Sequence, residues 1–366
     1  MILMNDFKAE PEDSRQNELN AIERVLRSGW YILGNEVNQF ESAWAIACGA
    51  THAIGVANGM DAIEIGLRTL GIGPGDEVIT TTMSAFATVL AIVRAGATPV
   101  LADVDPTTAL LSRESVESCI TKRTRAVLLV HLYGQVREMD EWIKLCTHHK
   151  LLLLEDCAQS HLAHLQGRVA GTFGEWGAYS FYPTKNLGAL GDAGALVTNR
   201  EDIASDARVL LNYGQSKRYH HPKIGLNSRL DEIQAAILSV RLESLSVNTR
   251  SRQQIARTYF EQIVNPEIEL LAKPVQEGSH VYHLFVVLCR QRDKLAAHMR
   301  NHSIETLIHY PIPIHKQPPC SELKISPHGM TQANKHAEMC LSLPCNPHLS
   351  ENQLSQIIGA VNAFQG

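Results

Sequence analysis

The sequence predicts an α/β protein with a mostly parallel sheet, followed by a smaller α+β domain. Up to about residue 200, short apolar runs of strand length alternate with segments of helical period. From about residue 245 this alternation stops. The 366 residues, 45% apolar and 19% charged, suffice for a large domain at 1–244 and a small one at 245–366, on which the N-terminal segment could pack.

The large domain contains seven predicted strands. Because helices separate most of them, we expect crossover connections, a largely parallel sheet and helices on both faces. The strands are predicted at 53–56, 77–82, 98–102, 126–131, 151–154, 176–181 and 193–197. The helices are predicted at 17–28, 37–48, 62–70, 114–120, 139–148 and 201–211, with a further one beginning at 83–88.

A long amphipathic helix leads into the small domain. Its apolar residues recur at intervals of three and four up to Val240, and it is predicted to run to Tyr259, with Asn227 and Ser228 in its N-cap region. Beyond it we expect a β-rich run at 281–288, a strand or loop at 307–314, and helices at 294–302 and 351–364.

Composition excludes several classes of function. A net charge of −5 gives no basic field for nucleic acid. No apolar run reaches the ~18–20 residues of a membrane helix, and the N-terminus is charged within six residues, so we expect a cytoplasmic protein. The eight cysteines, without C-x-x-C pairs, are expected to be reduced. His161 and His164 make a weak metal motif, so no metal site is predicted and His161 is interpreted as a pocket-wall residue.

Lys185 is the first candidate for chemistry. It follows the apolar run 176–181, and a glycine-rich segment with glycines at 188, 191 and 194 leads into the next run, so a tight turn between two strands is predicted. A lysine held there and partly desolvated is a nucleophile toward carbonyl groups. The alternative is a solvated surface lysine in a glycine-rich turn.

Asp156 favours the chemical interpretation. It stands at the carboxyl end of the leucine run 151–154, where open α/β sheets bind ligands. A strand-end carboxylate and a lysine on a turn match the needs of pyridoxal phosphate, whose aldehyde takes a lysine and whose ring nitrogen takes an acid. Gly59 and Met60, at a helix start, offer N–H groups for the phosphate; alternatively, this is only a helix start capped by Asn58 or Asp61.

Four motifs, in order along nearly the whole chain, carry a family resemblance. They are EDCAQSH, SFYPTKNLGALGDAGALVTN, LNYGQSKRYHH and GLNSRLDEIQAAIL. The chain resembles the DegT/DnrJ/EryC1/StrS family of sugar aminotransferases, nearest to the branch that acts on nucleotide-linked 3-keto-6-deoxyhexoses. The resemblance implies an aspartate-aminotransferase-like fold with a seven-stranded sheet, pyridoxal phosphate as cofactor, and a homodimer with shared active sites.

The resemblance also assigns roles to single positions. Lys185 and Asp156 would be catalytic, with Lys185 binding the cofactor aldehyde and serving as general base and acid. Phe86 would stack on the ring, Gln159 would bond near the ring oxygen, and Asn227 would reach the partner subunit's phosphate. The other cofactor contacts would be Gly59, Met60 and Ser180, and the substrate contacts Tyr31, Tyr182, Lys217, Tyr219, Arg229, His309 and Tyr310.

The implied reaction is amino transfer from glutamate to a dTDP-linked 3-keto-6-deoxyhexose, giving a 3-amino-3,6-dideoxyhexose for surface polysaccharide (such as lipopolysaccharide O-antigen) or glycoside biosynthesis. Three alternatives remain: a 4-keto-sugar substrate, a different reaction on the same cofactor, and a non-catalytic regulatory homologue. Lys185 counts against dehydration, because some dehydrating relatives carry histidine at this position.

Overall fold

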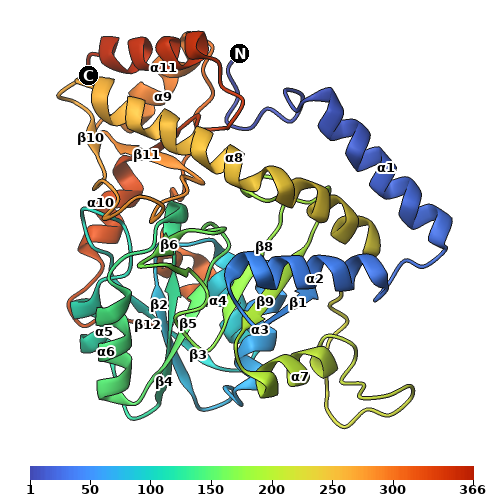
Figure 1. The fold of residues 1–366 in the computed structure, drawn as a ribbon. Coiled ribbons are helices and arrows are strands. Elements are labelled where there is room, and N and C mark those ends of the chain that lie inside the picture. The colour runs from blue at the N-terminus through green and yellow to red at the C-terminus, as the bar shows by residue number, and fades with distance from the viewer.

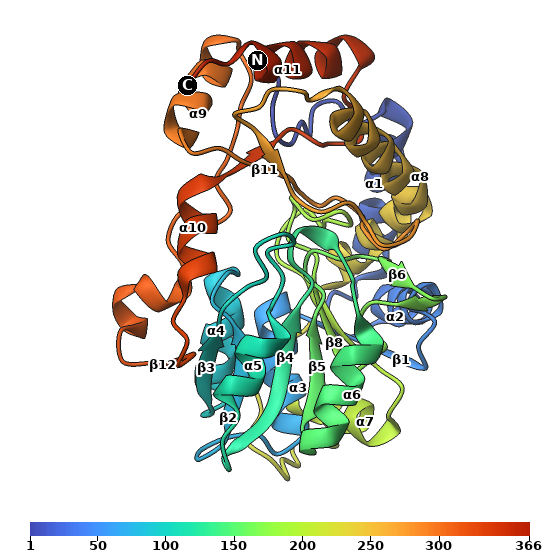
Figure 2. The same ribbon diagram turned by 90° about the vertical axis from the view of Figure 1, so that its left-hand side faces the viewer.

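An eight-stranded sheet forms the centre of the large domain (Figures 1 and 2). The computed structural model describes all 366 residues. The strand order is β1-β9-β8-β5-β4-β2-β3-β12, and β9 runs antiparallel to both its neighbours while the remaining pairs are parallel. The strands are β1 (His52–Val56), β2 (Glu77–Thr81), β3 (Thr98–Ala102), β4 (Thr124–Val130), β5 (Leu152–Asp156), β8 (Gly177–Ser180), β9 (Gly194–Thr198) and β12 (Lys324–Ile325).

The predicted mostly parallel sheet is confirmed, with one addition. Seven strands come from the predicted positions, and the eighth, β12, comes from the C-terminal part of the chain and pairs with β3. This two-residue strand carries no apolar run of its own, so its place in the sheet depends on how the C-terminal part docks.

Helices cover both faces of the sheet, as Figure 2 shows for α5 and α6 on one side and α3 and α7 on the other. One apolar layer joins the first face to α2, α5, α6 and the start of α8, and a second joins the opposite face to α3, α4 and α7. The bounds are α1 (Glu12–Ser28), α2 (Asn35–Cys48), α3 (Gly59–Thr69), α4 (Phe86–Arg94), α5 (Arg113–Cys119), α6 (Met139–His149), α7 (Glu201–Leu210) and α8 (Glu232–Gln262).

The C-terminal part has a separate three-stranded sheet and a separate core. Helix α8 connects the two parts, since its first turns pack on α1 and α2 and Tyr259 near its end lies in the C-terminal core. The predicted boundary at residue 244 therefore falls inside α8.

The remaining elements are β10 (Glu269–Leu270), β11 (Phe285–Leu288), β13 (Cys340–Leu343), α9 (Arg292–Asn301), α10 (Thr331–Met339), α11 (Glu351–Ala363), the hairpin β6 (His164–Leu165) and β7 (Arg168–Val169), and three short 3₁₀ turns, η1 (Leu132–Gly134), η2 (Ile314–Lys316) and η3 (Pro318–Cys320).

The predicted N-cap of α8 is wrong. The helix begins at Glu232 with Asp231 as its N-cap residue. Asn227 instead pairs through its backbone with Asn212, and the Ser228 hydroxyl accepts a hydrogen bond from Ala57 N at 3.1 Å. Tertiary contacts thus hold this segment extended past the point where its local sequence favours a helix start.

None of the helices combines the length and the apolar character needed to cross a membrane. All eight cysteines are free thiols and buried, as the sequence predicted.

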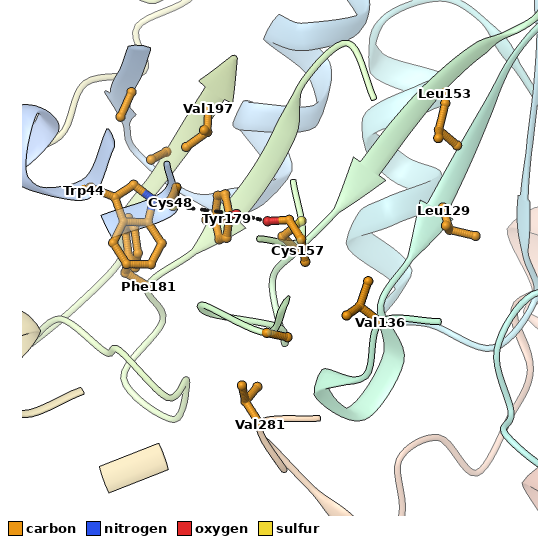
Figure 3. Packing of buried hydrophobic residues seen from close by; sticks show 14 of the residues in the cluster. Trp44, Cys48, Leu129, Val136, Leu153, Cys157, Tyr179, Phe181, Val197 and Val281 are labelled. Atoms are coloured by element: carbon orange, nitrogen blue, oxygen red, sulfur yellow. Dashed lines mark hydrogen bonds between the residues drawn. The ribbon is translucent and has the colours of Figure 1, made fainter. Parts of the chain in front are cut away.

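An aromatic cluster supports the sheet next to the strand that leads to Lys185 (Figure 3). Trp44 of α2 meets Tyr179 and Phe181 edge-on, with ring centroids 5.1 and 5.3 Å apart. His161 packs among these three rings and is fully buried, and burial lowers its pKa to about 3. His161 is therefore a neutral ring inside the core.

Glu155 fixes the segment between β5 and β8. Its Oε1 accepts hydrogen bonds from the N–H groups of Phe173 and Gly174, both at 2.8 Å, and its Oε2 accepts from Gly171 N at 2.7 Å. His131 Nε2 lies 2.9 Å from the same Oε2. His131, Glu155 and Cys157 lie within metal-binding distance of one another, but both carboxylate oxygens already serve these donors.

Glu155→Gln should lower the free energy of unfolding by about 2 kcal/mol, because an amide group would face buried donors that now share a carboxylate. Urea denaturation measures the change. Glu141→Gln, at an exposed pair with Lys144, is the control and should leave the midpoint unchanged. Equal midpoints for the two variants would contradict the structural role of Glu155.

Candidate active site

Lys185 lies on the loop between β8 and β9, as predicted. Phe181 N bonds to Ala193 O and Ala189 N bonds to Phe181 O, which closes the base of the loop, and Lys185 N bonds to Tyr182 O at 2.8 Å. A Cβ atom on Gly188 would lie 2.4 Å from the Pro183 carbonyl oxygen, so the loop folds tightly only with glycine there.

Asp156 is the last residue of β5, next to β8, and is only 5% exposed. Its Oδ2 accepts a hydrogen bond from the Thr88 hydroxyl at 2.8 Å and its Oδ1 accepts one from Ala158 N at 3.1 Å. Burial raises the pKa of Asp156, and these bonds and the ammonium of Lys185 oppose that rise. Thr88 thus orients the carboxylate from the neighbouring helix α4.

The same environment makes Lys185 reactive. Burial lowers the pKa of Lys185 to about 8, and the Asp156 carboxylate acts in the opposite direction. A substantial fraction of the amine is therefore neutral near physiological pH, and the neutral amine is the form that attacks a carbonyl group.

In cofactor-free protein, acylation of Lys185 should increase as the pH rises through about 8, because deprotonation produces the nucleophile. Mass spectrometry of reagent-treated protein measures this residue by residue. Lys144 is the internal control, since Glu141 raises its pKa and its labelling should begin at higher pH. Parallel pH profiles for the two lysines would contradict a desolvated Lys185.

A cradle for an anion lies where α3 begins. The N–H groups of Gly59 and Met60 are in the first turn and have no acceptor within the helix. Asn58 caps the helix by accepting from Asp61 N at 2.8 Å, so the capping role that the sequence left open is confirmed for Asn58. A Cβ on Gly59 would lie 2.7 Å from the Ser180 Cβ. Glycine therefore lets these amides and the Ser180 hydroxyl come together, an arrangement that suits a phosphate.

Phe86 is the first residue of α4 and its ring is 38% exposed, so it is free to contact a bound ring. Gln159 is less free. Its Oε1 accepts from Tyr133 N at 2.6 Å and its Nε2 donates to the Tyr310 hydroxyl at 3.2 Å. The Tyr133 hydroxyl in turn donates to His309 O at 2.6 Å, so these bonds join Gln159 to both C-terminal candidates.

Thr88 and Tyr133 are absent from the sequence prediction. Both follow strands of the parallel sheet at their carboxyl ends, Thr88 after β2 and Tyr133 after β4. That position is the signal that could have identified them. Thr88 bonds to Asp156, and Tyr133 bonds to Gln159 through its N–H and to His309 O through its hydroxyl, relations that no sequence motif displays.

The remaining predicted substrate contacts, and the predicted phosphate contact Asn227, are at least partly open to solvent in the single chain. Lys217, Tyr219, Asn227 and Arg229 belong to the long connection between α7 and α8, which projects from the body of the chain in Figure 1. No hydrogen bond or ion pair joins their side chains to Lys185, Asp156 or Ser180; Arg229 Nη1 donates instead to Asn212 Oδ1 at 3.2 Å. Tyr31 and Tyr182 are about half exposed.

The donor set fits pyridoxal phosphate. Lys185 matches its aldehyde, the buried carboxylate of Asp156 matches its ring nitrogen, and the cradle of Gly59, Met60 and Ser180 matches its phosphate. These groups come from the ends of the neighbouring strands β5 and β8, from the loop after β8 and from the start of α3.

Comparisons with known proteins identify a family. Residues 12–362 match the DegT/DnrJ/EryC1/StrS aminotransferase family. The dTDP-3-amino-3,6-dideoxy-alpha-D-galactopyranose transaminase of Aneurinibacillus thermoaerophilus is 44% identical over 344 residues, 94% of each chain. The pleiotropic regulatory protein of Geobacillus stearothermophilus is 39% identical over 363 residues, 99% of this chain and 98% of that one.

Among solved structures, S. venezuelae DesV in complex with a ketimine intermediate superposes with a TM-score of 0.94 at 42% identity, covering 99% of this chain and 97% of that one. The fold, the sequence motifs and the match over almost the whole length agree, and the chain belongs to the DegT/DnrJ/EryC1/StrS aminotransferase family.

Proposed function

We propose that the protein is a pyridoxal-phosphate-dependent aminotransferase that converts a dTDP-linked 3-keto-6-deoxyhexose to the 3-amino-3,6-dideoxyhexose, with glutamate as amino donor. The observation that carries the proposal is the pairing of Lys185, whose pKa is lowered to about 8, with the buried Asp156 at one edge of the sheet. The named activity of the Aneurinibacillus relative supports the sugar class. The product would enter surface-polysaccharide or glycoside biosynthesis.

Different residues of the chain would have different roles in the reaction. When bound, pyridoxal phosphate supplies an electron-withdrawing ring. Lys185 would hold the cofactor aldehyde, and its Nζ would serve as general base and acid for the proton transfer. Asp156, fixed by Thr88, would keep the ring nitrogen protonated. Ser180 and the amides at the start of α3 would hold the phosphate.

The active site is proposed to be shared between two chains. Lys217, Tyr219, Asn227 and Arg229 lie on an extended connection without a partner at the Lys185 site of their own chain. Tyr219 is 79% exposed and Ile224, on the same connection, is 90% exposed, so the connection offers apolar side chains to a second chain. A two-fold homodimer would use this connection twice and complete two equivalent sites.

Mixing Lys185→Ala chains with Asn227→Asp chains should restore activity that neither variant has alone. In a mixed dimer one site holds both wild-type residues and the other holds both lesions, so random exchange gives about a quarter of wild-type activity. Asn227→Asp acts by placing a negative charge against the phosphate. Differently tagged chains confirm exchange; heterodimers without recovered activity, or a fully active monomer by sedimentation, would contradict the shared site.

Purified protein tested against several dTDP-keto sugars, each with glutamate, decides the substrate. We expect amino transfer at C-3, and transfer only to 4-keto sugars would move the protein to another branch of the family. A regulatory role without catalysis is the second candidate, because one relative bears a regulatory name. A change in visible absorbance on adding glutamate distinguishes the two, since a protein that only holds the cofactor would show none.

A further inference from the structure

Arg252 of α8 is a buried cation without an anionic partner. The residue is 7% exposed. Its Nη1 donates to Cys345 O at 2.6 Å, while its Nε is buried without a partner and no carboxylate forms an ion pair with it. Burial lowers the pKa of the guanidinium. An unpaired buried charge is costly, so its presence calls for a compensating ligand.

Two adjoining cavities meet at Arg252. The smaller, about 70 Å³, is also lined by Thr184, His283 and His309. The larger, about 350 Å³, is also lined by Thr184 and by Lys185. Arg252 and Lys185 therefore line the same cavity.

The wall of the smaller cavity carries no acid. His283 Nδ1 is buried without a partner, and burial together with the Lys185 ammonium lowers the pKa of both His283 and His309. The larger cavity also has four acids on its wall, Asp6, Glu10, Glu18 and Glu243. Of these, Glu18 pairs with Arg241 at 2.6 Å and Glu10 with His348 at 3.6 Å, and none bonds to Arg252.

We propose that Arg252 binds the carboxylate of the amino donor. This inference rests on the proposed aminotransferase function and assigns the donor subsite. An amino-acid donor must bring its amine to the Lys185 site, and its carboxylate then needs a cation close by. A water molecule takes about 30 Å³, so the smaller cavity, at about 70 Å³, has room for a carboxylate group. Guanidinium groups bind carboxylates through paired N–H donors.

The test uses the cofactor-loaded enzyme with glutarate, a dicarboxylate that lacks an amine and cannot react. Arg252→Met removes the charge at similar volume, and Arg252→Lys keeps the charge without the paired N–H donors of the guanidinium. The control, Arg257→Met, removes an exposed arginine from the same helix. Calorimetry should show glutarate binding weakened roughly 10- to 100-fold in Arg252→Met, less in Arg252→Lys, and unchanged in Arg257→Met.

Stability separates this role from a structural one. Arg252→Met removes a buried charge that has no anionic partner, which offsets the loss of the bond to Cys345 O, so the variant should melt close to wild type, whereas a residue that holds the fold would clearly lower the melting temperature. If Arg252→Met does not fold, Arg252→Lys decides by the same binding measurement. The proposal is overturned by unchanged glutarate affinity in the folded variant, or by a loss of dTDP affinity in place of glutarate affinity.

The outcome is also distinct from that of the proposed function. Glutarate binding that depends on Arg252 in an enzyme that aminates no keto sugar would reject the sugar substrate and keep the donor subsite. Amination of the sugar with equal glutamate KM in wild type and Arg252→Met would keep the sugar substrate and reject the donor subsite at Arg252.

Discussion

Lys185→Ala should abolish amino transfer while leaving the fold intact. Both the covalent attachment of the cofactor and the proton transfer use the same Nζ, so one substitution removes two steps of the reaction. The loop does not depend on the side chain, because backbone bonds at Phe181, Ala189 and Ala193 close it. Turnover with glutamate and keto sugar should fall below detection, whereas the phosphate cradle, and with it some cofactor affinity, should remain.

Two controls make this result specific. Lys144→Ala removes an exposed lysine from α6 and should retain full activity. Borohydride reduction of the cofactor-loaded wild type, followed by peptide mapping, identifies the lysine that holds the cofactor. A label on any lysine other than Lys185 would reject the assignment whatever the activity of the mutant.

Much of the fold follows from local patterns in the sequence. The strand at 98–102 and the leucine run that became β5 were predictable because central strands of a parallel sheet are buried on both faces and therefore almost wholly apolar. The start of α8 was not predictable, because Ser228 and Asn227 are held by Ala57 and Asn212 from distant parts of the chain. β12 likewise exists only through its pairing with β3.

The candidate site also contains residues that local sequence patterns predict and residues that they do not. Lys185, Asp156 and Ser180 could be predicted because strand ends and glycine-rich turns have recognisable sequences, and the structure brings them to one edge of the sheet. Thr88 has only its place after a strand of the parallel sheet as a signal, and Arg252 has none, since an isolated arginine in a helix looks like any other until its neighbours are known. Asn227 and the residues around it need a second chain before their contacts can be tested.

Asp156→Asn should lower kcat by roughly 10²-fold or more, about 3 kcal/mol or more of transition-state stabilisation. The substitution removes the negative charge that would hold a proton on the ring nitrogen, and it changes almost nothing in shape. Thr88 can accept from the new amide group and donate to Ser84, whose hydroxyl oxygen lies 2.8 Å away, so no buried donor loses its partner.

The measurement must therefore separate chemistry from folding. The carboxamide oxygen of the Asp156→Asn variant can still accept from Ala158 N, so a normal melting temperature and full cofactor loading by absorbance are expected together with the low kcat. Asp140→Asn, at an exposed position in α6, is the matched control and should retain wild-type turnover. A folded, cofactor-loaded Asp156→Asn enzyme with near-normal kcat would remove Asp156 from the reaction and leave it as a buried partner of Thr88, because only the charge distinguishes the two side chains.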